Sequence, residues 1–260
     1  MLEAVPTNKA LAIDCQGLGI RYRQYQEKII TLKDAMVRLF RGSGFEDFWA
    51  LRNLDLRIYQ GECVGLIGFN GSGKSTLMKA IAGVLPPAEG GLKTTGRVTP
   101  LIELGAGFNN ELTGRENIFL NGAIMGFTRK QMEAKFKSIV EFSELEDFID
   151  VPLRNYSSGM RTRLGFAVAS DVDPDILLLD EVFAVGDESF REKCTERMNG
   201  FFESGKTIVI ASHDLGMVQK YCSRLIYLRK GELRADGNPQ DVLQVYREDI
   251  AAGKKARSAS

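Results

Sequence analysis

The stretch that decides the fold is GFNGSGKS at residues 68–75, which runs Gly68, Phe69, Asn70, Gly71, Ser72, Gly73, Lys74 and Ser75. It fits the phosphate-binding pattern G-x-x-x-x-G-K-[ST] without a mismatch. An apolar, strand-like segment precedes it at residues 63–67, and a segment with helical spacing follows it at residues 76–82. Glycines let successive backbone N–H groups surround an anion, and the following helix adds its positive N-terminal end. The stretch therefore predicts a phosphate-binding loop in an α/β fold.

The polar residues of this stretch have separate expected roles in binding a nucleoside triphosphate. Lys74 would bridge the β- and γ-phosphates, and the Ser75 hydroxyl would hold Mg²⁺. Further contacts to the nucleotide are expected from Gly68, Asn70, Gly71, Ser72, Gly73 and Thr76. The alternative is a plain glycine turn between a strand and a helix, and the pattern alone leaves it open.

The bulk composition argues against several classes of protein. Lys+Arg and Asp+Glu both number 34, so the formal net charge is zero, whereas a general nucleic-acid binder should carry a basic surplus. The cysteines Cys15, Cys63, Cys194 and Cys222 lie far apart and form neither a metal pair nor a disulfide framework. This favours a reducing cytosol as the protein's compartment. We find no signal peptide and no apolar run of about 18 residues, so neither secretion by that route nor a membrane span is expected.

The order of the expected elements favours a parallel sheet wrapped by helices. Strands are expected at residues 10–13, 50–59, 63–67, 96–103, 176–179, 207–211, 225–228 and 232–235, the first of them at a sheet edge. Helices are expected at residues 29–40, 113–148, 156–170, 189–203, 215–222 and 239–247. We therefore expect one α/β domain over residues 1–250, with a helical subdomain near residues 104–170 and a flexible tail at residues 251–260.

Three apolar strands are followed by residues suited to phosphate chemistry. One leads into the phosphate-binding loop, a second into Asp180 and Glu181, and a third into His213. Ligands of open α/β sheets bind beyond the carboxyl ends of the strands. If these strands are parallel neighbours, their terminal residues should face one crevice together with Lys74. Asp180 would then reach Mg²⁺ through its water shell, and Glu181 would accept a proton from the attacking water.

Two of these assignments have simpler alternatives. His213 is the chain's only histidine, and its place at a strand end favours a sensor of the γ-phosphate over an ordinary surface or core histidine. Asp180 and Glu181 could also be a pair of charges that merely ends a strand. A serine-rich helix start at residues 156–160, YSSGM, lies shortly before this strand. Alone it is only a helix cap, but helix N-termini also bind anions.

This order of motifs resembles the nucleotide-binding subunit of ABC transporters over residues 10–247. Residues 68–75 match Walker A, residues 176–180 match Walker B with Glu181 as its catalytic glutamate, and His213 matches the switch histidine. The resemblance implies a RecA-like core with an antiparallel β subdomain and an α-helical subdomain. It also implies nucleotide contacts beyond the loop, at Tyr22, Ser157, Ser158, Gly159 and Asp187. Tyr22 is the best match for the aromatic residue that stacks on adenine, and Tyr25 is a weaker one.

Two departures from the family pattern point to one branch of the family. The signature reads YSSGM instead of LSGGQ, so Met160 cannot hydrogen-bond as glutamine would. The segment that corresponds to the family's glutamine loop contains no glutamine. Glu103 is the nearest polar residue that could replace it as a partner of Mg²⁺ or of water. Together with ELGAGF, TGREN and DEVFAVGD, these departures resemble the branch that exports polysaccharides such as O-antigen, capsule or teichoic acid. The helix at residues 29–40 fits that branch as a helix near the membrane entrance, although a core-covering amphipathic helix is equally compatible.

The resemblance implies a mechanism and a set of partners. Two copies would pack head to tail, with each ATP between the Walker A motif of one copy and the signature of the other, and hydrolysis would separate them. A membrane permease dimer, docked on a groove near residues 103–116, would handle the lipid-linked glycan, so the chain would lie at the cytoplasmic face of the inner membrane. No nucleic acid and no C-terminal carbohydrate-binding domain are expected. A soluble ABC ATPase and a P-loop kinase are the competing hypotheses.

Overall fold

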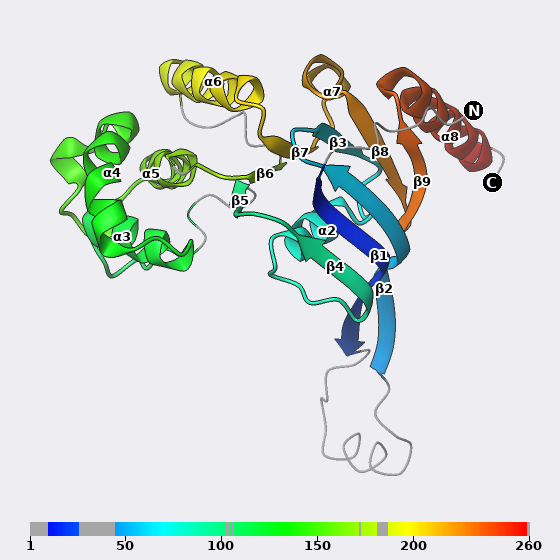
Figure 1. Cartoon of the computed structure of the whole chain (residues 1–260), viewed down its shortest axis with the longest axis horizontal. Helices are drawn as coiled ribbons and strands as arrows, with labels where there is room; N and C mark the ends of the chain where they lie inside the picture. The colour runs from blue at the N-terminus through cyan, green and yellow to red at the C-terminus, as the bar shows by residue number, and fades with distance from the viewer. Residues whose placement is uncertain are drawn as a thin grey trace, which may run out of the picture.

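The computed structural model describes residues 10–25, 45–101, 105, 107–171, 173–180 and 187–258, with side chains left out near some segment ends. The helix predicted at residues 29–40, Glu103, Glu181 and residues 184–186 lie outside these ranges. Two sheets form the centre of the molecule, and helices cover them (Figure 1). None of the helices in the described part of the chain has the length and apolar character that crossing a membrane requires.

The larger sheet has six strands in the order β5-β6-β7-β3-β8-β9. Its strands are β5 (Val98–Leu101), β6 (Ile176–Asp180), β7 (Thr207–Ala211), β3 (Cys63–Ile67), β8 (Arg224–Arg229) and β9 (Glu232–Gly237). All neighbours pair in parallel except β8 and β9, which form an antiparallel hairpin. The central parallel strands β6 and β7 are buried on both faces, which explains their continuous apolar runs. The predicted parallel sheet is confirmed.

The smaller sheet is antiparallel, with β1 (Leu11–Tyr25) between β2 (Phe45–Tyr59) and β4 (Glu89–Thr94). The prediction of an edge strand at residues 10–13 is therefore wrong, because β1 pairs on both sides. Strand β4 is not among the predicted strands, because its sequence EGGLKT has no apolar run. Gly90 is needed in the strand because its φ is +70° and an added Cβ would lie 2.2 Å from the Gly17 carbonyl oxygen.

Helix α2 (Lys74–Ile81) packs between the two sheets, in a core with residues of β1, β2, β3 and β7. The opposite face of the larger sheet is covered by α6 (Glu188–Glu203), α7 (Leu215–Tyr221) and α8 (Pro239–Ser258). Helix α8 continues well beyond the predicted residues 239–247, so residues 251–258 are helical and the expected tail is wrong there.

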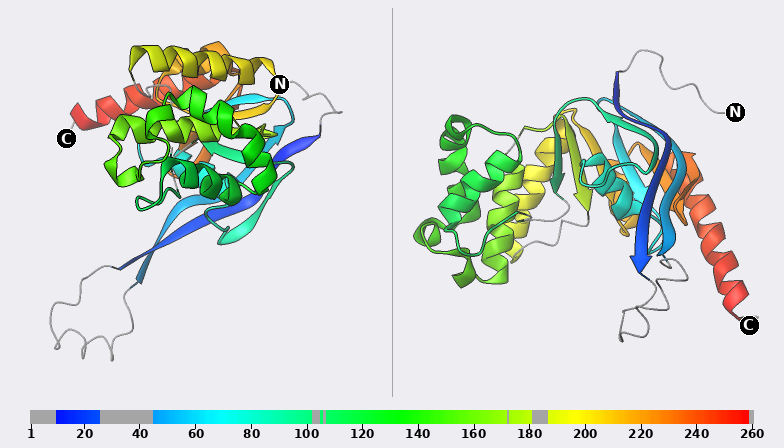
Figure 2. Two further views of the ribbon diagram at one scale, coloured as in Figure 1. Left: turned by 90° about the vertical axis from the view of Figure 1, so that its left-hand side faces the viewer. Right: turned by 90° about the horizontal axis from the view of Figure 1, so that it is seen from below.

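The helical subdomain contains α3 (Gly114–Ile124), α4 (Arg129–Ser143), α5 (Ser158–Ser170) and two short 3₁₀ turns, Glu146–Phe148 and Leu153–Asn155. These helices share an apolar core of their own and lie beside the sheets, on the side of the molecule opposite α8 (Figures 1 and 2). Capping boxes at Thr113 and Thr128 start α3 and α4, because each threonine and the residue three positions on satisfy each other's backbone N–H.

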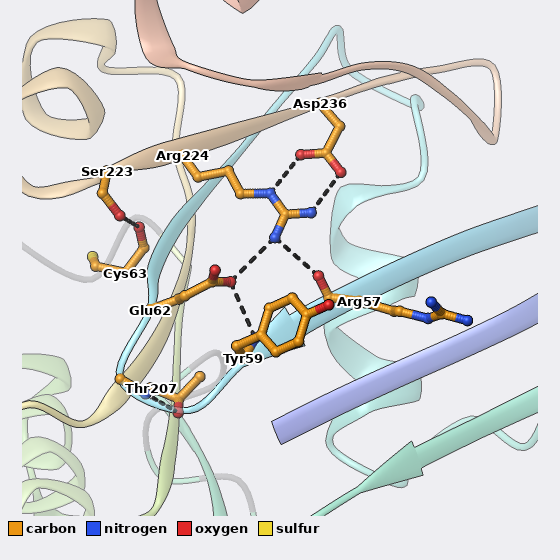
Figure 3. Close-up of polar contacts among 9 residues, drawn as sticks. Arg57, Tyr59, Glu62, Cys63, Thr207, Ser223, Arg224 and Asp236 are labelled. Carbon is orange, nitrogen blue, oxygen red and sulfur yellow. Dashed lines mark hydrogen bonds and ion pairs between the residues drawn. The ribbon is translucent and has the colours of Figure 1, made fainter. Parts of the chain in front are cut away.

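Arg224 joins the two sheets at the end remote from the carboxyl ends of the parallel strands. Figure 3 shows its guanidinium between Asp236 of β9 and Glu62, which precedes β3. Both bonds to Asp236 are 2.6 Å long, the bond to Glu62 is 3.1 Å, and a further bond of 3.0 Å reaches the Arg57 carbonyl oxygen of β2. A planar guanidinium suits this arrangement because its donors diverge in a fixed plane.

Candidate functional site

The glycine-rich loop leaves β3 and enters α2 in a conformation that only glycine permits at two positions. Gly68 has φ +154°, and a Cβ there would lie 2.4 Å from the Leu228 carbonyl oxygen and 2.5 Å from Ser72 Oγ. Gly73 has φ +106°, and a Cβ would lie 2.9 Å from the Ala50 carbonyl oxygen. The loop is therefore wedged between β2 and β8, which fixes the direction of its backbone N–H groups.

The Lys74 side chain lies back over this loop and is only 8% exposed. Its Nζ donates to the carbonyl oxygens of Gly68, at 2.8 Å, and Phe69, at 3.3 Å. A lysine in this position carries its positive charge to the concave side of the loop, where an anion would meet it. This geometry supports the predicted role of Lys74 as a phosphate ligand.

A pocket of about 320 Å³ opens at the carboxyl ends of the parallel strands. Its lining consists of the loop, the end of β6 and the turn after β7, namely Asn70, Gly71, Ser72, Gly73, Lys74, Ser75, Thr76, Asp180 and His213. The predicted convergence on one crevice is confirmed for Lys74, Asp180 and His213, whereas Glu181 lies outside the described residues. Strands β3, β7 and β6 are successive neighbours in the sheet, and this order brings the three side chains together.

The chemistry of the lining suits a nucleoside triphosphate with a divalent cation. Seven consecutive loop residues supply N–H and hydroxyl donors for phosphate oxygens. Ser75 and Asp180 provide the oxygen ligands that Mg²⁺ prefers, and Lys74 balances phosphate charge. The residues present therefore fit both groups.

The signature segment starts α5 but does not line this pocket. Ser157 is the N-cap, and its hydroxyl accepts a hydrogen bond of 3.2 Å from the Met160 N–H. Ser157, Ser158 and Gly159 are all exposed at this helix end. An exposed helix N-terminus with two serines can bind an anion presented from outside the chain.

Asp187 caps α6 and is tied to the signature helix. Its Oδ1 accepts a hydrogen bond of 3.1 Å from the Phe190 N–H, and its Oδ2 accepts one from the Arg163 guanidinium of α5. The Phe190 N–H and the Arg163 charge hold the pKa of Asp187 below its ordinary value. Arg163 also donates to Glu144 at the end of α4, so one arginine links three elements. No sequence motif points to Arg163, because its role depends on partners distant along the chain.

Tyr22, predicted to stack on adenine, lies on β1 opposite Phe48 of β2. Both aromatic side chains are exposed, and neither lines the phosphate pocket. Stacking of Tyr22 on adenine stays a prediction.

Fold and site together define a P-loop nucleoside triphosphatase domain. Residues 51–184, more than half of the chain, match the family described as "ABC transporter". The chain is 46% identical over 246 residues to the O-antigen export system ATP-binding protein RfbB of Myxococcus xanthus, covering 93% of this chain and 56% of that protein. It is 42% identical over 242 residues to the teichoic acids export ATP-binding protein TagH of Listeria monocytogenes, covering 93% of this chain and 71% of that protein.

The fold is also found in a solved dimeric ATP-binding cassette in a post-hydrolysis state with ADP and Pi. That structure has a TM-score of 0.67 and 22% identity, over 87% of this chain and 98% of its own. The family match and the two relatives show that the chain belongs to the ABC transporter family, which confirms the family resemblance in the sequence. It spans only about half of the Myxococcus relative, 56% of its length.

Proposed function

We propose that this chain binds and hydrolyses ATP to drive a membrane permease that exports a polysaccharide across the cytoplasmic membrane. The observation that carries the ATPase part is the pocket that Lys74, Asp180 and His213 share with the glycine-rich loop. The names of the relatives support the cargo class, since they describe ATP-binding proteins for O-antigen and teichoic acid export. In this proposal the chain lies peripherally at the inner face of that membrane.

The pocket residues, together with Glu181 and Glu103, have separate roles in the proposed hydrolysis. The loop N–H groups and Lys74 bind and orient the triphosphate, and Ser75 and Asp180 would hold Mg²⁺, which neutralises phosphate charge when bound. Glu181 follows Asp180 in sequence and takes the proton of the attacking water, a contribution of about 10²- to 10⁴-fold in rate. His213 contacts the γ-phosphate. Glu103 is proposed to orient water or Mg²⁺ where relatives of the wider family have glutamine.

A second copy of the chain completes the enclosure in this proposal. The exposed Ser157, Ser158 and Gly159 lie outside their own pocket, which supports a contact with the nucleotide held by the other copy. Binding of ATP would then favour the joined state, and hydrolysis would favour separation. The helical subdomain would pass this change to the permease.

The closing test compares two variants in the purified chain. Glu181→Gln should still bind ATP, hydrolyse it at least about 10²-fold more slowly, and elute as a dimer with ATP. Lys74→Ala should lose nucleotide binding and stay monomeric with ATP. Full turnover by Glu181→Gln would contradict the assigned base, and wild-type affinity of Lys74→Ala would remove Lys74 from the phosphate site.

Adenine binding and cargo need separate measurements. Tyr22→Ala should raise the dissociation constant of ATP by about tenfold or less, from the lost stacking, and an unaltered constant would exclude stacking at Tyr22.

For the cargo, a deletion strain should accumulate lipid-linked glycan inside the membrane. Normal glycan export in that strain, with the ATPase active in vitro, would favour a non-transport ABC ATPase instead.

A further inference from the structure

Three aromatic rings from distant parts of the chain meet beside the phosphate-binding loop. They are Phe69 of the loop, Tyr227 of β8 and Tyr246 of α8. The ring centroids of Phe69 and Tyr246 are 5.4 Å apart, and those of Tyr227 and Tyr246 are 5.1 Å apart with the planes at 79°. These separations lie in the range of attractive aromatic pairs. The loop therefore touches the C-terminal helix directly.

Phe69 connects this cluster to the groups that bind phosphate. Its carbonyl oxygen accepts a hydrogen bond of 3.0 Å from the Ser72 N–H, which closes the first turn of the loop. The same oxygen accepts a bond of 3.3 Å from Lys74 Nζ. The Phe69 ring remains 39% exposed, so the core does not hold it on all sides. The neighbouring tyrosines consequently restrict a side chain whose own backbone shapes the loop.

Helix α8 presents Tyr246 from a fixed position. Val242 and Leu243 of the same helix are buried in the core over the larger sheet. Asp249 lies one turn further on, and its side chain is 11% exposed. It accepts one hydrogen bond of 3.1 Å from the Tyr227 hydroxyl and forms an ion pair of 2.7 Å with Arg229. Burial alone would raise the pKa of Asp249, but these two donors outweigh burial and lower it. The carboxylate thus stays ionised and anchors α8 at neutral pH.

We propose that Tyr246 is a positioning residue for nucleotide binding. Its ring holds Phe69, and Phe69 in turn holds the backbone turn that surrounds the phosphates and receives Lys74. The inference rests on the proposed binding of ATP at this loop. In addition, α8 sets the affinity of the loop for ATP through Tyr246. Because Tyr246 does not line the pocket, it acts on binding through Phe69 and leaves the chemical step unchanged.

The test measures the dissociation constant of a non-hydrolysable ATP analogue with Mg²⁺, and kcat and KM for ATP, in the full chain. Tyr246→Ala should raise the dissociation constant and KM about two- to tenfold, because the aromatic pair that restrains Phe69 is lost, with kcat changed less than twofold. Tyr246→Phe keeps the ring and should behave as wild type. The matched control is Phe202→Ala, which breaks the stacked Phe202–Tyr221 pair, 4.2 Å apart and outside the pocket, and should leave affinity unchanged.

The outcomes separate this inference from the proposed function. Wild-type affinity of Tyr246→Ala, or an equal loss in Tyr246→Phe or Phe202→Ala, would overturn the positioning role, while ATP binding would stand as long as Lys74→Ala abolishes it. If Tyr246→Ala does not fold, Phe69→Leu removes the same contact from the loop side. That variant should show the same rise in the dissociation constant, and unchanged affinity in it would also overturn the inference.

Discussion

Gly68→Ala tests whether the loop is wedged as tightly as the structure indicates. The new Cβ would lie 2.4 Å from the Leu228 carbonyl oxygen and 2.5 Å from Ser72 Oγ. The first of these neighbours is backbone of a buried strand, and the second belongs to a buried side chain, so neither moves easily. Relief must come from a shift of the loop itself. The matched control is Gly83→Ala, where φ is +75° but nothing lies within 4 Å of the added Cβ.

The two substitutions differ in which costs they combine. A left-handed φ costs a non-glycine residue about 1–2 kcal/mol, as at Gly83. The φ of +154° at Gly68 lies further from the left-handed α region and costs at least as much. Overpacking adds about 1–3 kcal/mol at Gly68 only. With about 2–4 °C per kcal/mol for a chain of this size, Gly68→Ala should lower Tm by roughly 10 °C and Gly83→Ala by roughly 4 °C. A shifted loop also misaligns its N–H groups, so only Gly68→Ala should weaken ATP binding, by more than about tenfold.

Thermal unfolding and equilibrium binding of an ATP analogue provide the two readouts. The decisive comparison is between the variants, because both place a side chain at a positive φ and only Gly68→Ala adds the close contacts. Equal losses of Tm in both variants, together with wild-type affinity in Gly68→Ala, would refute the wedged-loop reasoning.

Three further predictions concern the framework around the site. Arg224→Ala should lower the free energy of unfolding by about 2–3 kcal/mol, because Asp236 loses a bidentate partner that is only partly exposed to water; the urea midpoint measures this, and a change below 0.5 kcal/mol, which is about the error of the method, contradicts it. Asn117→Ala should speed hydrogen exchange in residues 109–113, because the buried Asn117 donates to three carbonyl oxygens there and accepts one N–H; unchanged exchange would refute it. The Lys193 ammonium holds the pKa of Glu144 below its usual 4.5, so the stability from this pair is complete above pH 4.5 and is lost as pH falls through the lower folded-state value. Glu144→Gln should therefore flatten the acid limb of a Tm–pH curve, and an identical limb would exclude that contribution.

The parallel sheet could be predicted because its central strands are buried on both faces. Continuous runs such as ILLLD and TIVIA leave no alternation for a solvated face. The antiparallel sheet was harder, because its strands tolerate polar and glycine residues. Strand β4 contains Gly90, which allows close approach to the backbone of β1 but gives no apolar signal. Sequence patterns report side-chain burial, and here the backbone determines the pairing.

The same distinction applies to the site. Lys74, Asp180 and His213 could be predicted as neighbours, because each follows an apolar strand and parallel strands end at one edge. Phe69 occupies a position that the loop pattern leaves variable, so nothing in the pattern points to its contact with Tyr246. That contact depends on where α8 returns over the sheet, which the order of strands decides and local sequence does not.

The Arg163 network explains why the signature helix α5 and the start of α6 should respond together. One guanidinium contacts Glu144 at the end of α4 and Asp187 at the start of α6, and its Cζ atom lies 4.9 Å from the centre of the Phe190 ring. A displacement of Asp187 would therefore have to carry α5 with it or leave Arg163 without a partner for one arm. Asp180, seven positions earlier, lines the pocket. Arg163 therefore ties the N-cap of α6 to the helix whose exposed N-terminal serines are proposed to contact the other copy.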